Sequence, residues 1–169
     1  MPPELKYQNE GGPDLKACFE LLRRATRPSA PQVIRLLDAL LFNALIGNHD
    51  AHAKNFSLLY CEKTSTLAPL YDLLLTAVYP TLSAKMAMKL GSRYRFSEVQ
   101  VRHWDRFAEA AGLSQTQTRK RVVRMAEQLP SMARRLQAER AYRDHALIEG
   151  IVNLIEQRCA LTLRRFNES

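Results

Sequence analysis

The run from Val33 to Ile46 constrains the fold more than any other part of the chain. Pro31 suits the first turn of a helix here, and Gly47 suits its end. The apolar positions cover most of the helix circumference: Val33, Ile34, Leu36, Leu37, Leu40, Leu41, Phe42, Leu45 and Ile46. A helix that is apolar nearly all round belongs in a protein core. Arg35 and Asp38 interrupt the run, which is too short to span a bilayer, so we expect no membrane segment.

Helical periodicity also governs most of the remaining chain. Asp14 is placed to cap the helix that follows it, and Ser114 with Gln117 forms a capping box for another. The latter helix is expected to end at Leu129–Pro130, because proline removes a backbone donor, and Ser131 is expected to open a new one. Outside the central run, the predicted helices cover residues 14–25, 98–111, 114–129 and 131–169.

One small β-hairpin is predicted, near residues 56–72. Phe56–Tyr60 reads as a short buried strand, and "LAPLYD" (67–72) reads as a returning edge segment in which Pro69 limits pairing. "KMAMKLG" (85–91) is a further candidate for a short strand. The predicted fold class is therefore a single, mainly α domain with one small β-hairpin.

The composition is that of an ordinary globular protein, with 46% hydrophobic and 25% charged residues. Cys18, Cys61 and Cys159 have no zinc-like spacing, which favours reduced thiols in a cytosolic protein. The polar N-terminal segment lacks the apolar core of a signal peptide. These features predict a cytoplasmic location.

Polar residues are concentrated in the segment that follows the central helix. Asp50 and Asn55 are five positions apart in this segment, and Asp72 follows Asn55 across the predicted hairpin. This pattern is typical of phosphoryl transfer, in which one carboxylate accepts the hydroxyl proton while an amide oxygen and a second carboxylate hold magnesium. Lys54 is a candidate to neutralise charge on the transferred group. The D-x-x-x-x-N spacing equals that of the protein-kinase catalytic loop, although alone it is a weak indication.

Other interpretations compete at the same residues. His49 and His52 with Asp50 are also candidates for a transition-metal site of the metal-dependent phosphohydrolase kind. Such hydrolases need an upstream histidine, and no histidine precedes His49 in the chain. If these residues have no functional role, Asp50 and Asp72 are turn residues and Tyr71 is a core residue. In that case, His52 and Lys54 serve only to orient the loop.

The longer pattern resembles a known kinase family. "GNHDAHAKNFSLL" followed by "LAPLYDLLLTAVYP" closely resembles the catalytic segment of HipA-type serine/threonine kinases, the toxins of bacterial toxin–antitoxin pairs. "KYQNEGGPDL" and "KMAMKLG" also resemble that family, so the likeness covers residues 6–91. It implies that Asp50 is the catalytic base and that Asn55 and Asp72 are magnesium ligands. The residues that it places beside the nucleotide are His52, Ala53, Lys54, Asn55, Tyr71 and Asp72.

The resemblance carries further expectations about the whole protein. It implies a kinase-like C-terminal lobe, with a catalytic-loop half (1–91) and a basic helical half (92–169), that uses ATP and Mg²⁺. It implies phosphorylation of a serine or threonine hydroxyl on a protein such as glutamyl-tRNA synthetase, and a helix-turn-helix antitoxin of the HipB type. The six glycines form no glycine-rich loop after a predicted strand. We therefore expect the family's N-terminal lobe to be absent, and the chain to be inactive unless a separate N-lobe chain completes it.

The positive charge of the chain lies outside the polar loop. Residues 1–84 carry eight basic and eight acidic residues, whereas residues 114–143 carry eight basic and two acidic ones. Such a segment is a candidate for contact with DNA phosphates, and the family's binding to operator DNA gives the same expectation. The alternative is a solvated helix face. The candidate DNA contacts are Arg119, Lys120, Arg121 and Arg124. A non-catalytic module that binds antitoxin and operator DNA is the competing function.

Overall fold

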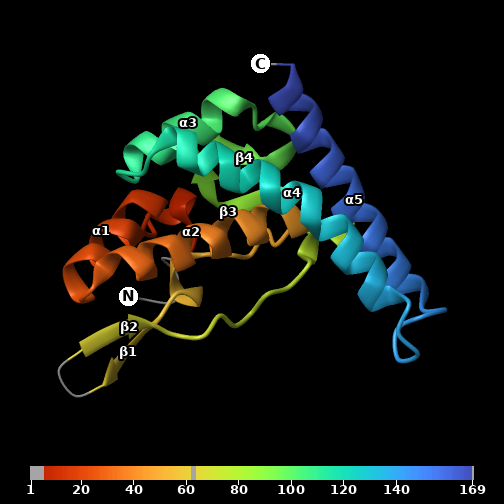
Figure 1. Cartoon of the computed structure of the whole chain (residues 1–169), viewed down its shortest axis with the longest axis horizontal. Helices are drawn as coiled ribbons and strands as arrows, with labels where there is room; N and C mark the ends of the chain where they lie inside the picture. Colours follow the sequence, from red (N-terminus) through yellow and green to blue (C-terminus); the bar gives the residue numbers. More distant parts are fainter. Residues whose placement is uncertain (1–5, 62–63, 169) are drawn as a thin grey trace.

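A computed structural model describes residues 6–61 and 64–168 of the chain, the Cys61 side chain excepted (Figure 1). In this part of the chain, five α-helices and two small antiparallel sheets pack around one core. The helices are α1 (Leu15–Ala25), α2 (Ser29–Ile46), α3 (Val101–Ala110), α4 (Gln115–Gln137) and α5 (Ala146–Asn167). The strands are β1 (Leu58–Cys61), β2 (Thr64–Leu67), β3 (Lys85–Leu90) and β4 (Arg93–Arg95). Single 3₁₀ turns are η1 (Gln8–Glu10), η2 (Ala53–Asn55), η3 (Thr76–Val78) and η4 (Phe96–Glu98).

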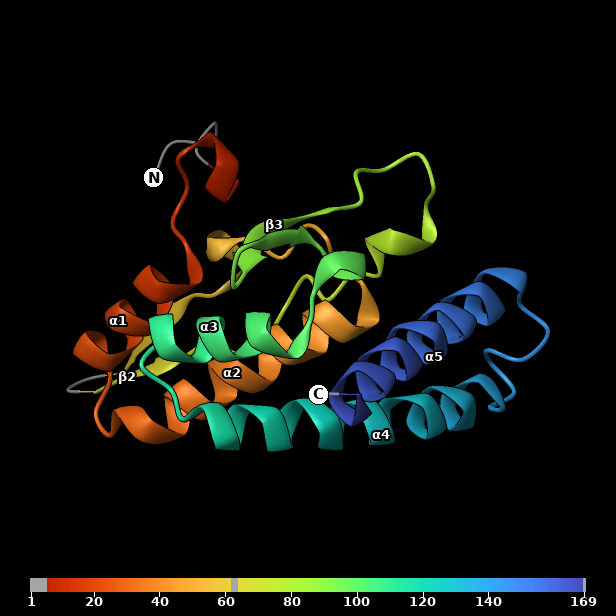
Figure 2. The same ribbon diagram turned by 90° about the horizontal axis from the view of Figure 1, so that it is seen from above.

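Helix α2 is the core helix that its sequence predicts. Leu41 and Leu45 are fully buried, and the helix contacts α1, α4 and α5 (Figures 1 and 2). Its 18 residues are long and apolar enough to cross a membrane, yet 56% of them are buried inside the protein. The core around α2 includes Phe19 and Leu22 of α1, Trp104 and Phe107 of α3, Val122 and Ala126 of α4, and Ile155 and Cys159 of α5.

The predicted helix ends are confirmed where capping residues mark them. The Asp14 carboxylate accepts a hydrogen bond from the backbone N–H of Ala17 at 2.8 Å, and Ser114 Oγ accepts one from Gln117 at 3.3 Å. Gly47 ends α2 in the left-handed region, with φ of 89°. These local signals fix helix boundaries because they satisfy backbone groups that the helix itself leaves unpaired.

The predicted break in α4 is wrong. The helix continues through Pro130 to Gln137, although an interior proline costs about 3 kcal/mol. Packing against α5 explains this, since the two helices lie side by side along this half (Figure 2). Arg134, beyond the proline, donates to Glu156 at 2.5 and 2.6 Å and to Asn153 at 2.9 Å on α5. Tertiary contacts therefore override the local break.

The hairpin is confirmed, but its returning strand lies earlier than predicted. Leu58 pairs with Leu67 and Cys61 with Thr64, while residues 62–63 of the reversal lie outside the described residues. Residues 68–75 are irregular rather than an edge strand, because Pro69 has no N–H to donate and Asp72 has a positive φ of 58°. Strand β3 forms as expected. Its partner β4 was not predicted, because "RYR" is short and polar.

We expect Leu41→Ala to lower the free energy of unfolding by about 2–5 kcal/mol, since it leaves a cavity at a fully buried position. Leu21→Ala is the matched control, because Leu21 is 52% exposed on α1 and its loss should change stability by less than about 0.5 kcal/mol. Urea unfolding followed by circular dichroism measures both variants. Equal losses would contradict the placement of α2 at the centre of the core.

Candidate active site

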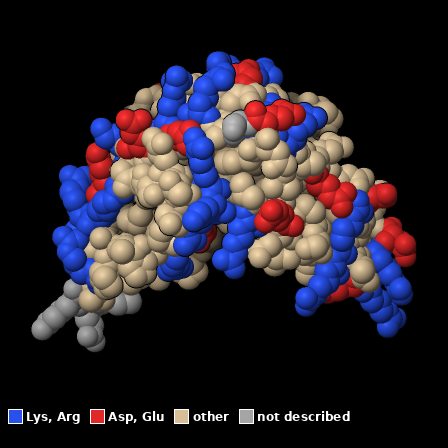
Figure 3. Space-filling model, turned by 45° about the horizontal axis from the view of Figure 1, so that its top comes forward, with Lys and Arg blue, Asp and Glu red and all other residues tan. Residues whose placement is uncertain are grey.

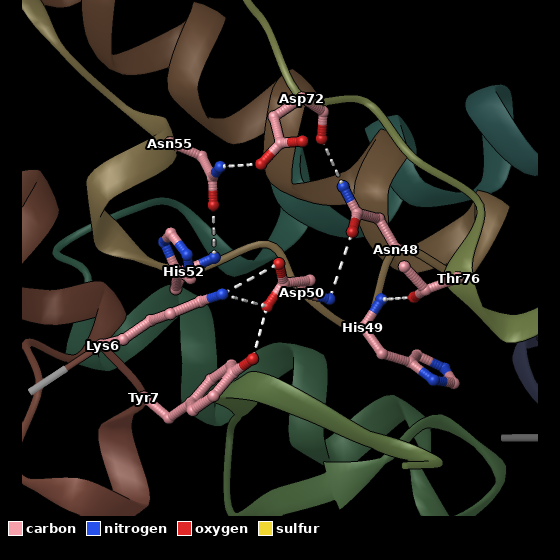
Figure 4. Close-up of polar contacts among 9 residues, drawn as sticks. All are labelled: Lys6, Tyr7, Asn48, His49, Asp50, His52, Asn55, Asp72 and Thr76. Atoms are coloured by element: carbon pink, nitrogen blue, oxygen red, sulfur yellow. Dashed lines mark hydrogen bonds and ion pairs between the residues drawn. The ribbon is translucent and has the colours of Figure 1, made fainter. Parts of the chain in front are cut away.

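The polar loop leaves the end of α2 and is organised by Asn48. The Asn48 amide Nδ2 donates to Asn43 Oδ1 and to the Asp72 carbonyl, both at 2.9 Å (Figure 4). Its Oδ1 accepts a hydrogen bond from the Asp50 backbone N–H at 3.1 Å. The Asn48 side chain is buried, so each of these bonds replaces a lost contact with water. One side chain thus joins α2, the loop and the segment that carries Asp72.

Asn55 and Asp72 meet across this loop. The Asn55 Oδ1 accepts a hydrogen bond from the His52 backbone N–H at 2.9 Å, which fixes the orientation of the amide. Its Nδ2 then donates to Asp72 Oδ2 at 2.5 Å. Asp72 adopts a left-handed backbone conformation with φ of 58°, which aspartate tolerates better than most residues. The structure therefore brings together the two predicted magnesium ligands from segments 17 positions apart.

Asp50 lies on the opposite side of the loop, facing the N-terminal segment (Figure 4). Lys6 Nζ lies 3.0 Å from Asp50 Oδ1 and donates to Oδ2 at 3.1 Å. The Tyr7 hydroxyl donates to Asp50 Oδ1 at 2.6 Å. The hydrogen bond to Asp50 raises the pKa of Lys6, and the same partner raises the pKa of Tyr7. A lysine ammonium and a tyrosine hydroxyl ordinarily lose their protons only near pH 10, so both groups are donors at neutral pH.

The two loop histidines point in different directions. His49 Nδ1 lies 3.0 Å from the Ser83 carbonyl, and its ring points away from Asp50 (Figure 4). Burial lowers the pKa of His49, and it also lowers the pKa of His52. The His52 ring lies edge-on to Tyr7, with 6.1 Å between ring centroids. Within residues 6–61 and 64–168, no group of three or more His, Cys, Asp and Glu side chains is placed to hold a metal ion.

The other predicted nucleotide contacts lie towards the hairpin. The Tyr71 hydroxyl donates to the Lys54 carbonyl at 2.6 Å and is 2.8 Å from Ser57 Oγ. Tyr71 is 45% exposed, so it is not a core residue. Ala53 and Lys54 line a groove of about 370 Å³ between α1 and the hairpin, together with Cys18, Leu21 and Phe56 among others. It shares no lining residue with a second groove, of about 490 Å³, that Asp50 and Tyr7 line.

The oxygen donors of Asn55 and Asp72 fit a hard cation such as Mg²⁺. One amide carbonyl oxygen and one carboxylate are ligands that magnesium accepts, with water filling its other positions. The present contact joins the Asn55 nitrogen to Asp72, so a cation bound by both oxygens would replace this hydrogen bond.

The four candidate DNA-binding residues of α4 differ in their surroundings. Arg119 donates to both oxygens of Asp105 at 2.7 and 2.6 Å, and Arg121 donates to both oxygens of Asp38 at 2.8 and 2.9 Å. Lys120 and Arg124 are exposed, and they line a groove of about 540 Å³ with Gln117, Arg121 and Gln128 among others. Figure 3 shows Lys and Arg in several groups, interleaved with Asp and Glu.

Lys6, Tyr7 and Thr76 were not assigned to the site from the sequence. The Thr76 hydroxyl accepts a hydrogen bond from the His49 backbone N–H at 2.8 Å, which ties the loop to η3. Lys6 and Tyr7 lie within the family-like segment "KYQNEGGPDL", which was noted without a role. That segment was the available signal, but nothing in its spacing indicates that it folds against Asp50.

Comparison with known proteins places the chain in a family. Residues 1–133 match the model of the HipA-like C-terminal domain. The chain belongs to this family. It is 42% identical over 163 residues to a Sinorhizobium fredii protein named "Putative kinase Y4mE". This match covers 95% of the present chain and 39% of that relative. It is 26% identical over 119 residues to the serine/threonine-protein kinase toxin HipA of Shewanella oneidensis, covering 70% of this chain and 27% of the toxin.

A solved structure shares the HipA-like fold. It is described as the HipA, HipB and operator DNA complex of the Shewanella oneidensis toxin–antitoxin system, and one of its chains superposes with a TM-score of 0.85 at 22% identity. The match covers 99% of this chain and 42% of that one. The present chain thus spans well under half the length of these relatives.

We expect Asn48→Ala to destabilise the protein by about 1–3 kcal/mol, because it leaves the buried polar partners of Asn48 without their hydrogen bonds. Asn9→Ala, which alters an exposed asparagine in η1, is the control and should be close to neutral. Thermal unfolding measures both. If Asn48→Ala were neutral as well, the loop would not depend on this side chain.

Proposed function

We propose that this chain is the catalytic-loop lobe of a HipA-type serine/threonine protein kinase. The reaction is transfer of the γ-phosphoryl group of ATP to a serine or threonine hydroxyl of a protein. The observation that carries the proposal is that Asn48 bonds to the backbone of both Asp50 and Asp72, while the Asp72 carboxylate accepts a hydrogen bond from Asn55. Membership of the HipA-like family supports the same reaction.

The three residues take distinct roles in this proposal. Asp50 accepts the proton of the attacking hydroxyl, because its carboxylate lies at the accessible side of the loop and is 29% exposed. Asn55 and Asp72 hold Mg²⁺, which when bound neutralises charge on the nucleotide phosphates. His52, Ala53, Lys54 and Tyr71 flank these ligands on η2 and the segment after the hairpin, and we assign them to the nucleotide.

The rest of the reaction requires parts beyond the described residues. The relatives are more than twice as long as the matched region, and we propose that an N-lobe, possessed by such kinases, supplies the phosphate loop and adenine hinge to this chain. Without that lobe we expect transfer by these 169 residues to be weak. We further propose a cytoplasmic setting, a HipB-type antitoxin as partner, and a substrate of the aminoacyl-tRNA synthetase class.

The sharpest test of the metal site compares two aspartates with the same backbone conformation. Asp72 and Asp144 both have positive φ, 58° and 63°, which asparagine also tolerates. Asp72→Asn should therefore keep the fold but weaken Mg²⁺-dependent ATP binding by about ten-fold or more, because it removes a ligand charge. Asp144→Asn should bind as the wild type does. Isothermal titration calorimetry with and without Mg²⁺ measures both.

Two results would count against this proposal. One is equal Mg²⁺-dependent binding by the wild type and Asp72→Asn. The other is any phosphoryl transfer to protein that survives Asp50→Ala, since the proposed base would then be dispensable.

A second candidate function is contact with DNA through α4. Lys120 and Arg124 are exposed beside one groove, whereas Arg119 and Arg121 are held by Asp105 and Asp38. If α4 contacts DNA phosphates, Lys120→Ala and Arg124→Ala should each weaken binding and reduce its salt dependence by about one unit of slope. Arg140→Ala, in the turn after α4, is the charge-matched control. Salt-titrated fluorescence anisotropy with duplex DNA measures this, and unchanged affinity in both groove variants would exclude this surface.

A further inference from the structure

The segment before α1 is built against the catalytic loop rather than left as a free end. The Tyr7 carbonyl accepts hydrogen bonds from the N–H groups of Glu10 at 3.0 Å and Gly12 at 2.9 Å. Gly11 has a φ of 93°, a conformation that favours glycine. Gln8 Oε1 accepts a hydrogen bond from the Lys89 N–H at 2.7 Å, so a side chain satisfies the free edge of β3. These contacts hold residues 6–12 in one place.

Because residues 6–12 are held in this way, the side chains of Lys6 and Tyr7 both contact the Asp50 carboxylate. Lys6 and Tyr7 contact both oxygens of Asp50 at 2.6 to 3.1 Å, although they precede it by more than forty positions. A lysine ammonium has three N–H groups, so contact with a carboxylate leaves donor capacity for another oxygen. Lys6 is 34% exposed and Asp50 29% exposed, so a ligand can reach both.

The position of Lys6 bears on the chemistry. In the proposed reaction, the hydroxyl oxygen bonds to the γ-phosphorus while the bond from that phosphorus to the β,γ-bridging oxygen breaks. The hydroxyl proton passes to Asp50, and ADP leaves. The transferred group therefore passes beside Asp50, where its oxygens carry negative charge. A cation fixed at this point stabilises that charge in the transition state.

We propose that Lys6 is a catalytic residue that binds the transferred phosphoryl group, and that Tyr7 is a positioning residue that orients Asp50. This inference rests on the proposed kinase function. It revises the role given to Lys54, which lines the groove between α1 and the hairpin, whereas Lys6 directly contacts Asp50.

A second groove supports the assignment by offering a path for the acceptor hydroxyl. Asp50 and Tyr7 line a groove of about 490 Å³ that also includes Thr76, Leu82 and Met86. A polypeptide hydroxyl that enters this groove meets Asp50 beside Lys6 and Tyr7. The acceptor hydroxyl and the proposed cation thus reach the same carboxylate, which places the hydroxyl close to the group that it attacks.

The test compares binding of Mg²⁺·ADP with binding of Mg²⁺·ADP–aluminium fluoride, which mimics the transferred group, by isothermal titration calorimetry on the full chain. The wild type should prefer the fluoride complex by roughly 100-fold. Lys6→Met should lose about ten-fold or more of this preference while its affinity for Mg²⁺·ADP stays within about two-fold. Lys6→Arg should restore most of the preference, because it restores the charge. Lys16→Met removes an exposed lysine of α1 and should match the wild type.

The outcomes separate this inference from the function on which it rests. If the wild type binds neither complex even when the proposed N-lobe is added, the proposed kinase function fails and the inference fails with it. If the wild type prefers the fluoride complex and Lys6→Met does so equally, the inference alone fails. If Lys6→Met weakens both complexes equally and lowers the unfolding midpoint, Lys6 is structural and the inference again fails.

Tyr7→Phe tests the positioning role separately. The phenylalanine keeps the ring against His52 but removes the donor to Asp50. We expect slower phosphoryl transfer with an unchanged KM for ATP, measured with radiolabelled ATP after the proposed N-lobe has been added to the wild type and to the variant. A faster rate would instead make Tyr7 an inhibitory cap that occupies the place of the substrate hydroxyl, and it would overturn this part of the proposal.

Discussion

The burial of α2 is the constraint on which the site depends. The helix is apolar on most of its surface, so α1, α4 and α5 cover it, and its last turn ends inside the protein. Carbonyl groups at a buried helix end need partners, and Arg158 of α5 donates two hydrogen bonds to the Ala44 carbonyl. Gly47 then turns the chain in a space where a Cβ would lie 2.7 Å from Ala77 Cβ. Packing around the end of α2 thus fixes the direction in which the polar loop leaves the core. This direction does not depend on the side chains of the candidate site.

Beyond Gly47, hydrogen bonds between neighbouring segments position the polar side chains of the candidate site. Asn48 bonds to the backbone N–H of Asp50 and to the backbone carbonyl of Asp72, so a single buried amide joins the two segments that carry these residues. A carboxylate favours a cation beside it. Lys6 meets Asp50 in this way, while Asp72 accepts from Asn55 where a metal ion would otherwise neutralise it. The two carboxylates thus have different neighbours, a lysine for Asp50 and an amide for Asp72.

Sequence patterns predicted correctly those parts of the fold that depend on contacts between residues close in sequence. Helical periodicity with caps at Asp14 and Ser114 gave correct helix starts, because a cap satisfies groups within one turn. The break expected at Pro130 failed, since contacts with α5 outweigh the missing donor. In the candidate site, the approach of Asn55 to Asp72 was predictable because a short hairpin joins the two segments, whereas the roles of Asp50, Asn55 and Asp72 stay predictions. The Lys6 contact was not, because more than forty residues separate it from Asp50 and only the packed fold brings them together.

The basic half of the chain shows why charge alone is a poor guide to a partner. Half of the candidate DNA contacts on α4 are ion-paired within the protein: Arg121 pairs with Asp38 of α2, and Arg119 with Asp105 of α3. Such exposed pairs contribute little stability, but their geometry directs these two guanidinium groups towards the protein's own helices. Lys120 and Arg124 are exposed in the α4 groove, and this surface is formed without residues of the catalytic loop. Phosphoryl transfer and nucleic-acid contact would consequently use separate surfaces, so either could be lost by mutation while the other is kept.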